Sequence, residues 1–550
     1  MISQCLKKWT FLFLLMAGLM GVAKPAQAQE LKYLPVQDAG RVKPFDTFAR
    51  EMLSIVYGKS TFEGREAYEI VFTWMLSPES WQKKALFEVR NFELLKNLNL
   101  PADKKLFTGE ELFNNDRFTL LRQELQAKRD SKEKLNPYFQ ALQRLENQFF
   151  IFQEMASGRL LRLIPTDQAW VSVYDFNSDQ QVLFLALTKA FVNYLGVVSG
   201  TVGGSEGGRA GEVKEALKFL DQAVNQFEDY ARTQNPAHYP DLSKIKTEVH
   251  YNDFHPFRWA YICYLLTSLL LLWIWISDKT SVMKWAWVVL ALGFVLHTYG
   301  FLIRVYLMGR APVTNMYETV VWVAWGSVVF AAILEKIYKF KFILLAGSLV
   351  GLFSLVIADM APVVLDPSLQ PLEPVLRSNY WLTIHVMTIT ISYAAFFLAL
   401  CLADLGLVYF LRGEEQNKEK IKAVALSVYR CMQIGVMFLT PGIILGGIWA
   451  DYSWGRFWGW DPKETWALIA LLGYVAALHA KMVGWLKDFG MLVSAIGTFS
   501  LVIMAWYGVN FVLGAGLHSY GFGAGGIEYV LAFVLAHAAW VATVAFLRKD

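Results

Sequence analysis

Apolar residues are distributed unevenly along this chain. From about residue 257 onward, long apolar stretches follow one another with short polar segments between them. Before that point, from about residue 29 to 255, Leu and Phe recur at helical spacing among Lys and Glu. About 20 apolar residues in helical form can cross the roughly 30 Å hydrocarbon core of a bilayer. The pattern predicts an all-α polytopic membrane protein with about nine transmembrane helices and an N-terminal, mainly helical extracytoplasmic domain.

The apolar stretches and the soluble helices can be given as residue ranges. The nine predicted spans lie near 259–276, 285–308, 316–334, 342–358, 381–411, 431–449, 464–485, 490–512 and 527–547. The fifth is too long for a perpendicular crossing, so we expect it to tilt or to extend into water. Helices of the soluble part are expected near 84–98, 108–128, 134–158 and 212–232.

The first residues resemble a secretory signal. Lys7 and Lys8 precede an apolar stretch from Trp9 to Ala23, and Ala26-Gln-Ala28 has the small residues of a cleavage site. An uncleaved anchor is the alternative, and either one sends the next segment out of the cytoplasm. We therefore divide the chain into a signal peptide (1–28), an extracytoplasmic domain (29–255) and a transmembrane domain (256–550).

The charges of the connecting segments agree with this orientation. If the chain starts outside after the signal, the inner segments carry 14 Lys or Arg and the outer loops carry only four, Arg310, Arg377, Arg456 and Lys463. Cytoplasmic loops carry an excess of Lys and Arg in membrane proteins. The expected location is the bacterial inner (cytoplasmic) membrane, with the N-terminal domain outside the cytoplasm.

Composition and cysteine content exclude some functions. Apolar residues make up 55% of the chain and charged ones 18%, and the net charge of +4 is too small and too dispersed to indicate nucleic acid binding. The four cysteines, Cys5, Cys263, Cys401 and Cys431, form no CxxC or CxxCH motif. The chain is therefore neither a thiol-disulfide exchanger of the usual kind nor itself a c-type cytochrome.

One short segment concentrates aromatic residues. Between the spans 431–449 and 464–485, the outer loop 449–466 contains Trp454-Gly-Arg-Phe-Trp-Gly-Trp-Asp-Pro-Lys-Glu464. Tryptophans collect at bilayer interfaces in general, but here they surround glycines that let a planar partner approach the backbone. We expect Trp454, Phe457, Trp458 and Trp460 to form a ledge that binds such a partner. Asp461 either contributes to that site or caps the next helix, since Pro462 and Glu464 complete a capping signature.

This segment resembles a known signature. The residues WGRFWGWDPKETWA (454–467) are similar to the tryptophan-rich WWD motif of CcsA/ResC-type proteins, which handle haem in cytochrome c maturation (system II). Two further stretches match that family in the same order, Gly309-Arg-Ala-Pro-Val-Thr-Asn-Met-Tyr-Glu318 and Gly508-Val-Asn-Phe to Gly516-Leu-His-Ser-Tyr-Gly521. The resemblance covers about residues 259–547 and implies that the bound planar molecule is haem b.

Histidines lie where such a molecule would need them. His385 and His518 are predicted on the outer face, on either side of the tryptophan-rich loop in sequence, and haem iron takes two axial ligands. The resemblance implies that these two are external haem ligands. His297 and His479 fall inside spans, where an ionisable residue suggests a function. They could hold haem within the bilayer, although their depths differ by a turn or two and His537 is a rival to His297.

Basic residues near the outer face could pair with the two haem propionates. The candidates are Arg304, Arg310, Arg456 and Lys463. Arginine suits planar carboxylate pairing, but interfacial snorkelling is the alternative for each.

The resemblance implies a haem-handling subunit of a holocytochrome c synthase. The partners it implies are the CxxCH segment of an apocytochrome c, a CcsB/ResB-type membrane subunit, thiol-reducing proteins and membrane lipid. No Ser, Cys or carboxylate is expected as a nucleophile or acid-base catalyst. Two alternatives stay open: a haem exporter or chaperone that serves a separate lyase, and a membrane scaffold or transporter of another solute.

Overall fold

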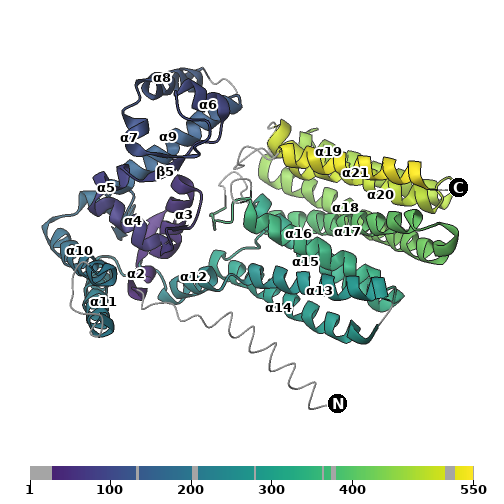
Figure 1. The fold of residues 1–550 in the computed structure, drawn as a ribbon, viewed down its shortest axis with the longest axis horizontal. Helices are drawn as coiled ribbons and strands as arrows, with labels where there is room; N and C mark the ends of the chain where they lie inside the picture. The colour runs from purple at the N-terminus through teal and green to yellow at the C-terminus, as the bar shows by residue number, and fades with distance from the viewer. Residues whose placement is uncertain are drawn as a thin grey trace, which may run out of the picture. The chain divides into compact units, whose positions relative to one another are not determined.

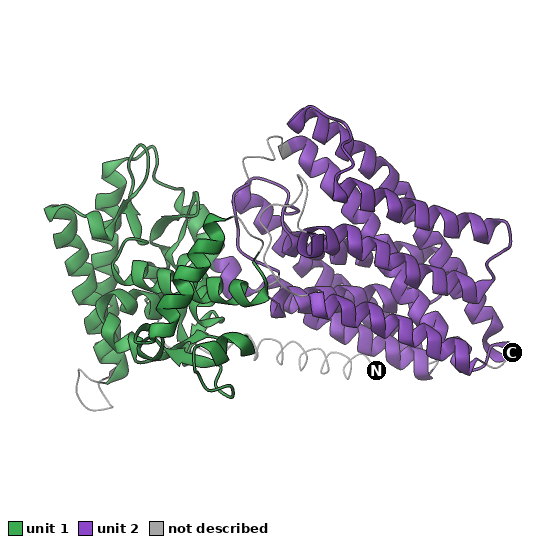
Figure 2. Ribbon diagram, turned by 90° about the horizontal axis from the view of Figure 1, so that it is seen from above, with its two compact units in different colours: residues 1–249 green, residues 250–550 purple. Residues whose placement is uncertain are grey.

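A computed structural model of the chain describes residues 28–131, 135–200, 209–277, 280–361, 365–372, 379–513 and 527–548. The chain divides into two compact units after Val249, within helix α12, and Figure 2 shows them in green and purple. The sequence placed the domain boundary a few residues later, at 255.

Unit 1 combines helices with short antiparallel hairpins. Its helices are α2 (Gln29–Tyr33), α3 (Phe45–Tyr57), α4 (Ala67–Leu76), α5 (Pro78–Gln82), α6 (Phe92–Asn97), α7 (Gly109–Phe113), α8 (Asp116–Asp130), α9 (Pro137–Ala156), α10 (Ser178–Ser199), α11 (Arg209–Gln234) and α12 (Leu242–Phe254). The paired strands are β1 (Pro35–Asp38) with β2 (Arg41–Pro44), β3 (Thr61–Phe62) with β4 (Arg65–Glu66), β5 (Ala85–Glu88) with β6 (Leu106–Thr108), and β7 (Arg162–Ile164) with β8 (Val171–Ser172).

Two details of unit 1 were not predicted. The segment expected as one helix near 84–98 is divided into β5 and α6, and the one expected near 108–128 is divided into α7 and α8. The hairpin β1–β2 carries a fully buried ammonium group, that of Lys43, which lies 2.8 Å from Asp38 and 2.5 Å from Glu51. Burial raises the pKa of the Glu51 carboxyl, although Lys43 opposes this shift. The buried charges are therefore compensated within the hairpin and α3.

Helix α10 is a tenth apolar helix. Ten helices among the described residues are long and apolar enough to cross a membrane, and α10 is the one in unit 1. It buries Leu187 and Phe191 in the core of unit 1, while Val182, Leu185 and Val192 on its other face are exposed. Apolar residues on both faces explain why its composition resembles that of a membrane span.

Unit 2 is a helical bundle (Figure 1). Its helices are α13 (Pro256–Ser277), α14 (Met283–Met308), α15 (Met316–Tyr338), α16 (Phe342–Met360), α17 (Asn379–Leu411), α18 (Lys418–Trp454), α19 (Pro462–Met482), α20 (Asp488–Ile503) and α21 (Ile527–Leu547); α20 continues as the π-helix η5 (Met504–Leu513). These correspond to the nine predicted spans. The predicted all-α polytopic class is confirmed, and the protein is a multi-pass membrane protein.

Helix α17 lies at the centre of the bundle. It packs against α15, α16, α18 and α20, while α13 packs against α14 and α16. Small residues allow these close approaches: a Cβ at Gly347 of α16 would lie 2.2 Å from Cβ of Ala331, and one at Gly435 of α18 would lie 2.2 Å from the Phe396 ring. The close packing fixes the helix ends, and with them the loops that carry the candidate site.

Candidate functional site

The connections predicted to face outward meet at one end of the bundle, which we call the loop end. Contacts from separate parts of the chain join there. Trp506 of η5 donates a hydrogen bond to Thr319 at the start of α15 (3.0 Å), and Lys463 at the start of α19 donates to Asn510 of η5 (3.3 Å). Leu372, in the segment before α17, packs in one apolar cluster with Trp449 and Trp454 near the end of α18.

His385 is fixed against α18 at the loop end. It is half-buried in the second turn of α17, and its Nδ1 lies 2.8 Å from the carbonyl oxygen of Gly442. Its ring is parallel to that of Trp449, with 6.1 Å between centroids and 8° between planes. A carbonyl only accepts, so Nδ1 carries the proton and Nε2 has the lone pair that a metal requires. Such second-sphere bonds orient metal-binding histidines.

A glycine makes this placement possible. A Cβ at Gly446, one turn after Gly442 in α18, would lie 2.6 Å from Cε1 of His385. The imidazole therefore sits directly on the backbone of α18, in a position that any larger residue at 446 would disturb.

Glu464 organises the tryptophan-rich loop. Helix α18 ends at Trp454, where Gly455 takes a left-handed conformation with φ 72°. The Glu464 carboxylate then accepts hydrogen bonds from the backbone N–H of Gly459 (2.8 Å), from the backbone N–H of Asp461 (3.1 Å) and from Arg456 (3.0 Å). The loop is thereby folded back onto the first turn of α19.

Asp461 caps α19. Its carboxylate accepts from the backbone N–H of Lys463 at 3.0 Å and, with Glu464, completes a capping box. This is the second of the two roles that the sequence allowed for Asp461. Because Arg456 pairs with Glu464, its guanidinium also supports the loop in this structure.

The aromatic rings of the loop do not form one flat ledge. Trp449 and Trp454 meet at 67° with centroids 4.7 Å apart, and Trp458 and Trp460 meet at 90° with centroids 5.7 Å apart. Trp449 is buried, whereas Trp460 is 68% exposed. The loop therefore offers exposed ring surface next to the stack of buried Trp449 and half-buried His385, instead of a single platform.

The two histidines predicted within the bilayer are not brought together. His297 is fully buried, with Nδ1 3.1 Å from the Tyr264 hydroxyl and Nε2 3.1 Å from the Val321 carbonyl. His479 is exposed on α19, and its Nδ1 lies 2.8 Å from the Val475 carbonyl. Helix α14 packs against α13 and α15, whereas α19 packs against α18, α20 and η5.

His537, the rival to His297, is held by two hydrogen bonds. His537 of α21 has Nδ1 2.8 Å from the Phe533 carbonyl and Nε2 3.1 Å from the Asp404 carboxylate of α17. Both of its ring nitrogens therefore have protein partners. His518 lies outside the described residues.

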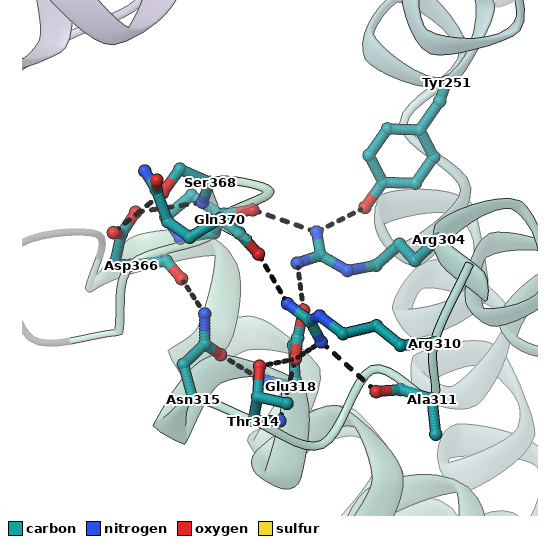
Figure 3. A network of polar contacts seen from close by, with 11 residues as sticks. Tyr251, Arg304, Arg310, Ala311, Thr314, Asn315, Glu318, Asp366, Ser368 and Gln370 are labelled. Carbon is teal, nitrogen blue, oxygen red and sulfur yellow. Dashed lines mark hydrogen bonds and ion pairs between the residues drawn. The ribbon is translucent and has the colours of Figure 1, made fainter. Parts of the chain in front are cut away.

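Two of the predicted propionate partners are engaged elsewhere. Arg304 and Arg310 each lie 3.0 Å from a carboxylate oxygen of Glu318 (Figure 3). Sequence reasoning listed these arginines but missed Glu318. The sequence does contain a signal for this ion pair: Arg304 and Arg310 precede Glu318 closely in the chain.

Comparison with known proteins agrees with the resemblance. The family described as "Cytochrome C assembly protein" matches residues 313–518, which include His385, the tryptophan-rich loop and His518. Protein NrfI of Wolinella succinogenes is 28% identical over 504 residues, covering 88% of this chain. The chain spans about half of NrfI (53%).

Two shorter relatives each match less than half of this chain. The "Cytochrome c biogenesis protein CcsA" of Parasynechococcus marenigrum is 33% identical over 292 residues, covering 48% of this chain and 94% of that protein. The protein of the same name from Chlamydomonas reinhardtii is 37% identical over 233 residues, covering 40% of this chain and 64% of that protein. On this evidence the chain belongs to the cytochrome c assembly family and is a CcsA-type cytochrome c biogenesis protein.

Proposed function

We propose that this protein delivers haem b to the outer face of the membrane and supports its covalent attachment to an apocytochrome c. The observation that carries the proposal is His385. Its Nδ1–H donates to the Gly442 carbonyl of α18, which leaves the lone pair on Nε2, and its ring stacks on Trp449. It lies at the end of the bundle that carries the family's tryptophan-rich motif.

The outer site would use two histidines as axial ligands. His385 would ligate the iron through Nε2 from one side and His518 from the other, as haem iron takes ligands above and below its plane. Trp454, Phe457, Trp458 and Trp460 would contact the porphyrin. Arg456 and Asp461 would act by shaping this loop, through Glu464 and through the cap of α19.

A second site would hold haem inside the bilayer. His479 is the stronger candidate, because it is exposed on α19 and its Nδ1 lies beside the Val475 carbonyl, which leaves the lone pair on Nε2. Its counterpart would come from a CcsB/ResB-type partner subunit. His297 is the alternative, but ligation would require loss of its hydrogen bond with Tyr264.

Covalent attachment of haem would require no nucleophile or acid-base catalyst from this chain. Each cysteine thiol of the CxxCH segment adds across a haem vinyl group: the sulfur bonds to one vinyl carbon, and the thiol hydrogen ends on the other. The addition needs no oxidant, so the protein would contribute mainly position and axial ligation. Thiol-reducing proteins would keep the CxxCH cysteines reduced. The proposed location is the bacterial inner membrane, with unit 1 and the tryptophan-rich loop outside the cytoplasm, and the positive-inside pattern supports this orientation.

Absorption spectra of the purified membrane protein test this function. The protein should carry haem, with a Soret band that changes in His385→Ala and His518→Ala, and His479→Ala should lower the haem content. Added imidazole should restore the spectrum of the His385→Ala variant. A colourless protein, or a spectrum that none of these variants changes, would refute the proposal. Covalent cytochrome formation in a host without its own maturation system would distinguish a synthase subunit from a haem exporter.

A further inference from the structure

A buried ion cluster at the loop end joins the motif 309–318 to Arg304 of α14. The Glu318 carboxylate accepts from Arg304 through one oxygen and from Arg310 through the other, both at 3.0 Å. Its side chain is 0% exposed, and those of Arg304 and Arg310 are 1% and 5% exposed. We call these three residues the Glu318 clamp.

The clamp binds the segment 365–372, which precedes α17. Arg304 donates to the Pro367 carbonyl at 2.9 Å, and Arg310 donates to the Gln370 carbonyl at 2.7 Å (Figure 3). Asn315, the N-cap of α15, adds a bond to the Asp366 carbonyl at 3.3 Å. The arginines therefore join the facing ends of α14 and α15 to a segment about 60 residues further along the chain.

The same segment reaches the candidate haem site. Leu372, two residues after Gln370, packs in the apolar cluster formed with Leu382 of α17 and Trp449 of α18. Trp449 is the ring parallel to His385. A continuous series of contacts thus runs from the Glu318 clamp through residues 370–372 to the Trp449–His385 stack.

We propose that the Glu318 clamp positions the outer haem site by holding residues 365–372 against the Trp449–His385 stack. Glu318, Arg304 and Arg310 are positioning residues in this scheme, and none of them contacts haem. This assigns the motif 309–318 a role and replaces propionate binding as the role of Arg304 and Arg310. The inference rests on the proposed function for its haem readout, but the contact it describes can be tested without haem.

The first test measures access to residue 372. A Leu372→Cys substitution, in a background without the four native cysteines, is labelled with a maleimide in the purified full-length protein. Breaking a buried ion pair leaves an uncompensated charge, so Glu318→Gln or Arg310→Gln should raise the labelling rate by roughly tenfold or more. Glu335→Gln is the matched control, since Glu335 is a buried carboxylate at the other end of the same helix. An unchanged rate in folded Glu318→Gln and Arg310→Gln protein would overturn the inference.

The second test measures the haem spectrum of the same variants. Glu318→Gln and Arg310→Gln should shift the Soret band in the direction of His385→Ala, Arg310→Lys should restore it in part, and Glu335→Gln should leave it unchanged. Faster labelling without a spectral change would overturn the positioning role. If His385→Ala itself leaves the spectrum unchanged, the proposed function fails. The labelling result would still show whether the Glu318 clamp holds residues 365–372. Should Glu318→Gln not fold, Arg310→Gln and Arg310→Lys provide both readouts.

Discussion

At the scale of single residues, the placement of His385 depends on glycine at position 446. A helical glycine normally costs a helix about 0.5–1 kcal/mol relative to alanine. Here the absent Cβ leaves the space in which the imidazole lies, since a Cβ would be 2.6 Å from the ring. The helix therefore gives up some intrinsic stability so that His385 can lie on its backbone.

Gly446→Ala should consequently lose His385 as a ligand without loss of the fold. The ring must move, and its bond to the Gly442 carbonyl (2.8 Å) must lengthen or break. The expected result is an absorption spectrum like that of His385→Ala in protein of normal yield. Gly497→Ala in α20 is the control, because a Cβ there meets nothing within 4 Å and should be neutral or slightly stabilising. A wild-type spectrum in Gly446→Ala would show that the ring tolerates the added methyl group.

At the scale of elements, the tryptophan-rich loop is shaped by the first turn of α19. One carboxylate, Glu464, accepts from two backbone N–H groups and from Arg456. The capping signature in the sequence predicted the contact with Asp461, which the structure contains. The bonds to Gly459 and Arg456 close the loop and have no signature of their own.

Glu464→Gln should loosen this loop. The amide retains one acceptor oxygen and loses the ion pair, and unsatisfied or lost bonds of this kind cost about 1–3 kcal/mol. Limited trypsin digestion of the membrane protein should cleave after Arg456 faster than in the wild type. Glu419→Gln, an exposed residue in the first turn of α18, should leave cleavage unchanged. Equal cleavage in all three proteins would indicate that the loop is held by its aromatic packing alone.

At the scale of the whole molecule, the hydropathy pattern and the observed helices both indicate a multi-pass membrane protein. Its orientation in the membrane is inferred from the Lys and Arg content of the connecting segments. The positive-inside pattern predicts that the loop end lies outside the cytoplasm. A single cysteine at Trp460, which is 68% exposed, should then react in intact cells with a membrane-impermeant maleimide. A single cysteine at Glu415, in the connection between α17 and α18, should react only after lysis. The reverse pattern would place the tryptophan-rich loop in the cytosol.

The sequence alone predicted what depends on local composition. The length of the apolar stretches predicted the membrane helices, and the tryptophan-rich motif indicated where the candidate site lies. It failed where a pattern has more than one three-dimensional solution. The segment 84–98 divides into a strand and a short helix because β5 pairs with β6.

Only the tertiary structure decided which side chains meet. The sequence shows where the histidines occur along the chain. It does not show their hydrogen-bond partners, because the partners of His385, His297 and His537 lie on other helices. Arg304 and Arg310 appeared suited to an external carboxylate, and the fold instead pairs both with Glu318. Local composition fixes how much apolar surface a segment must bury, whereas a hydrogen bond or ion pair between distant residues depends on helix packing, which no short window of sequence contains.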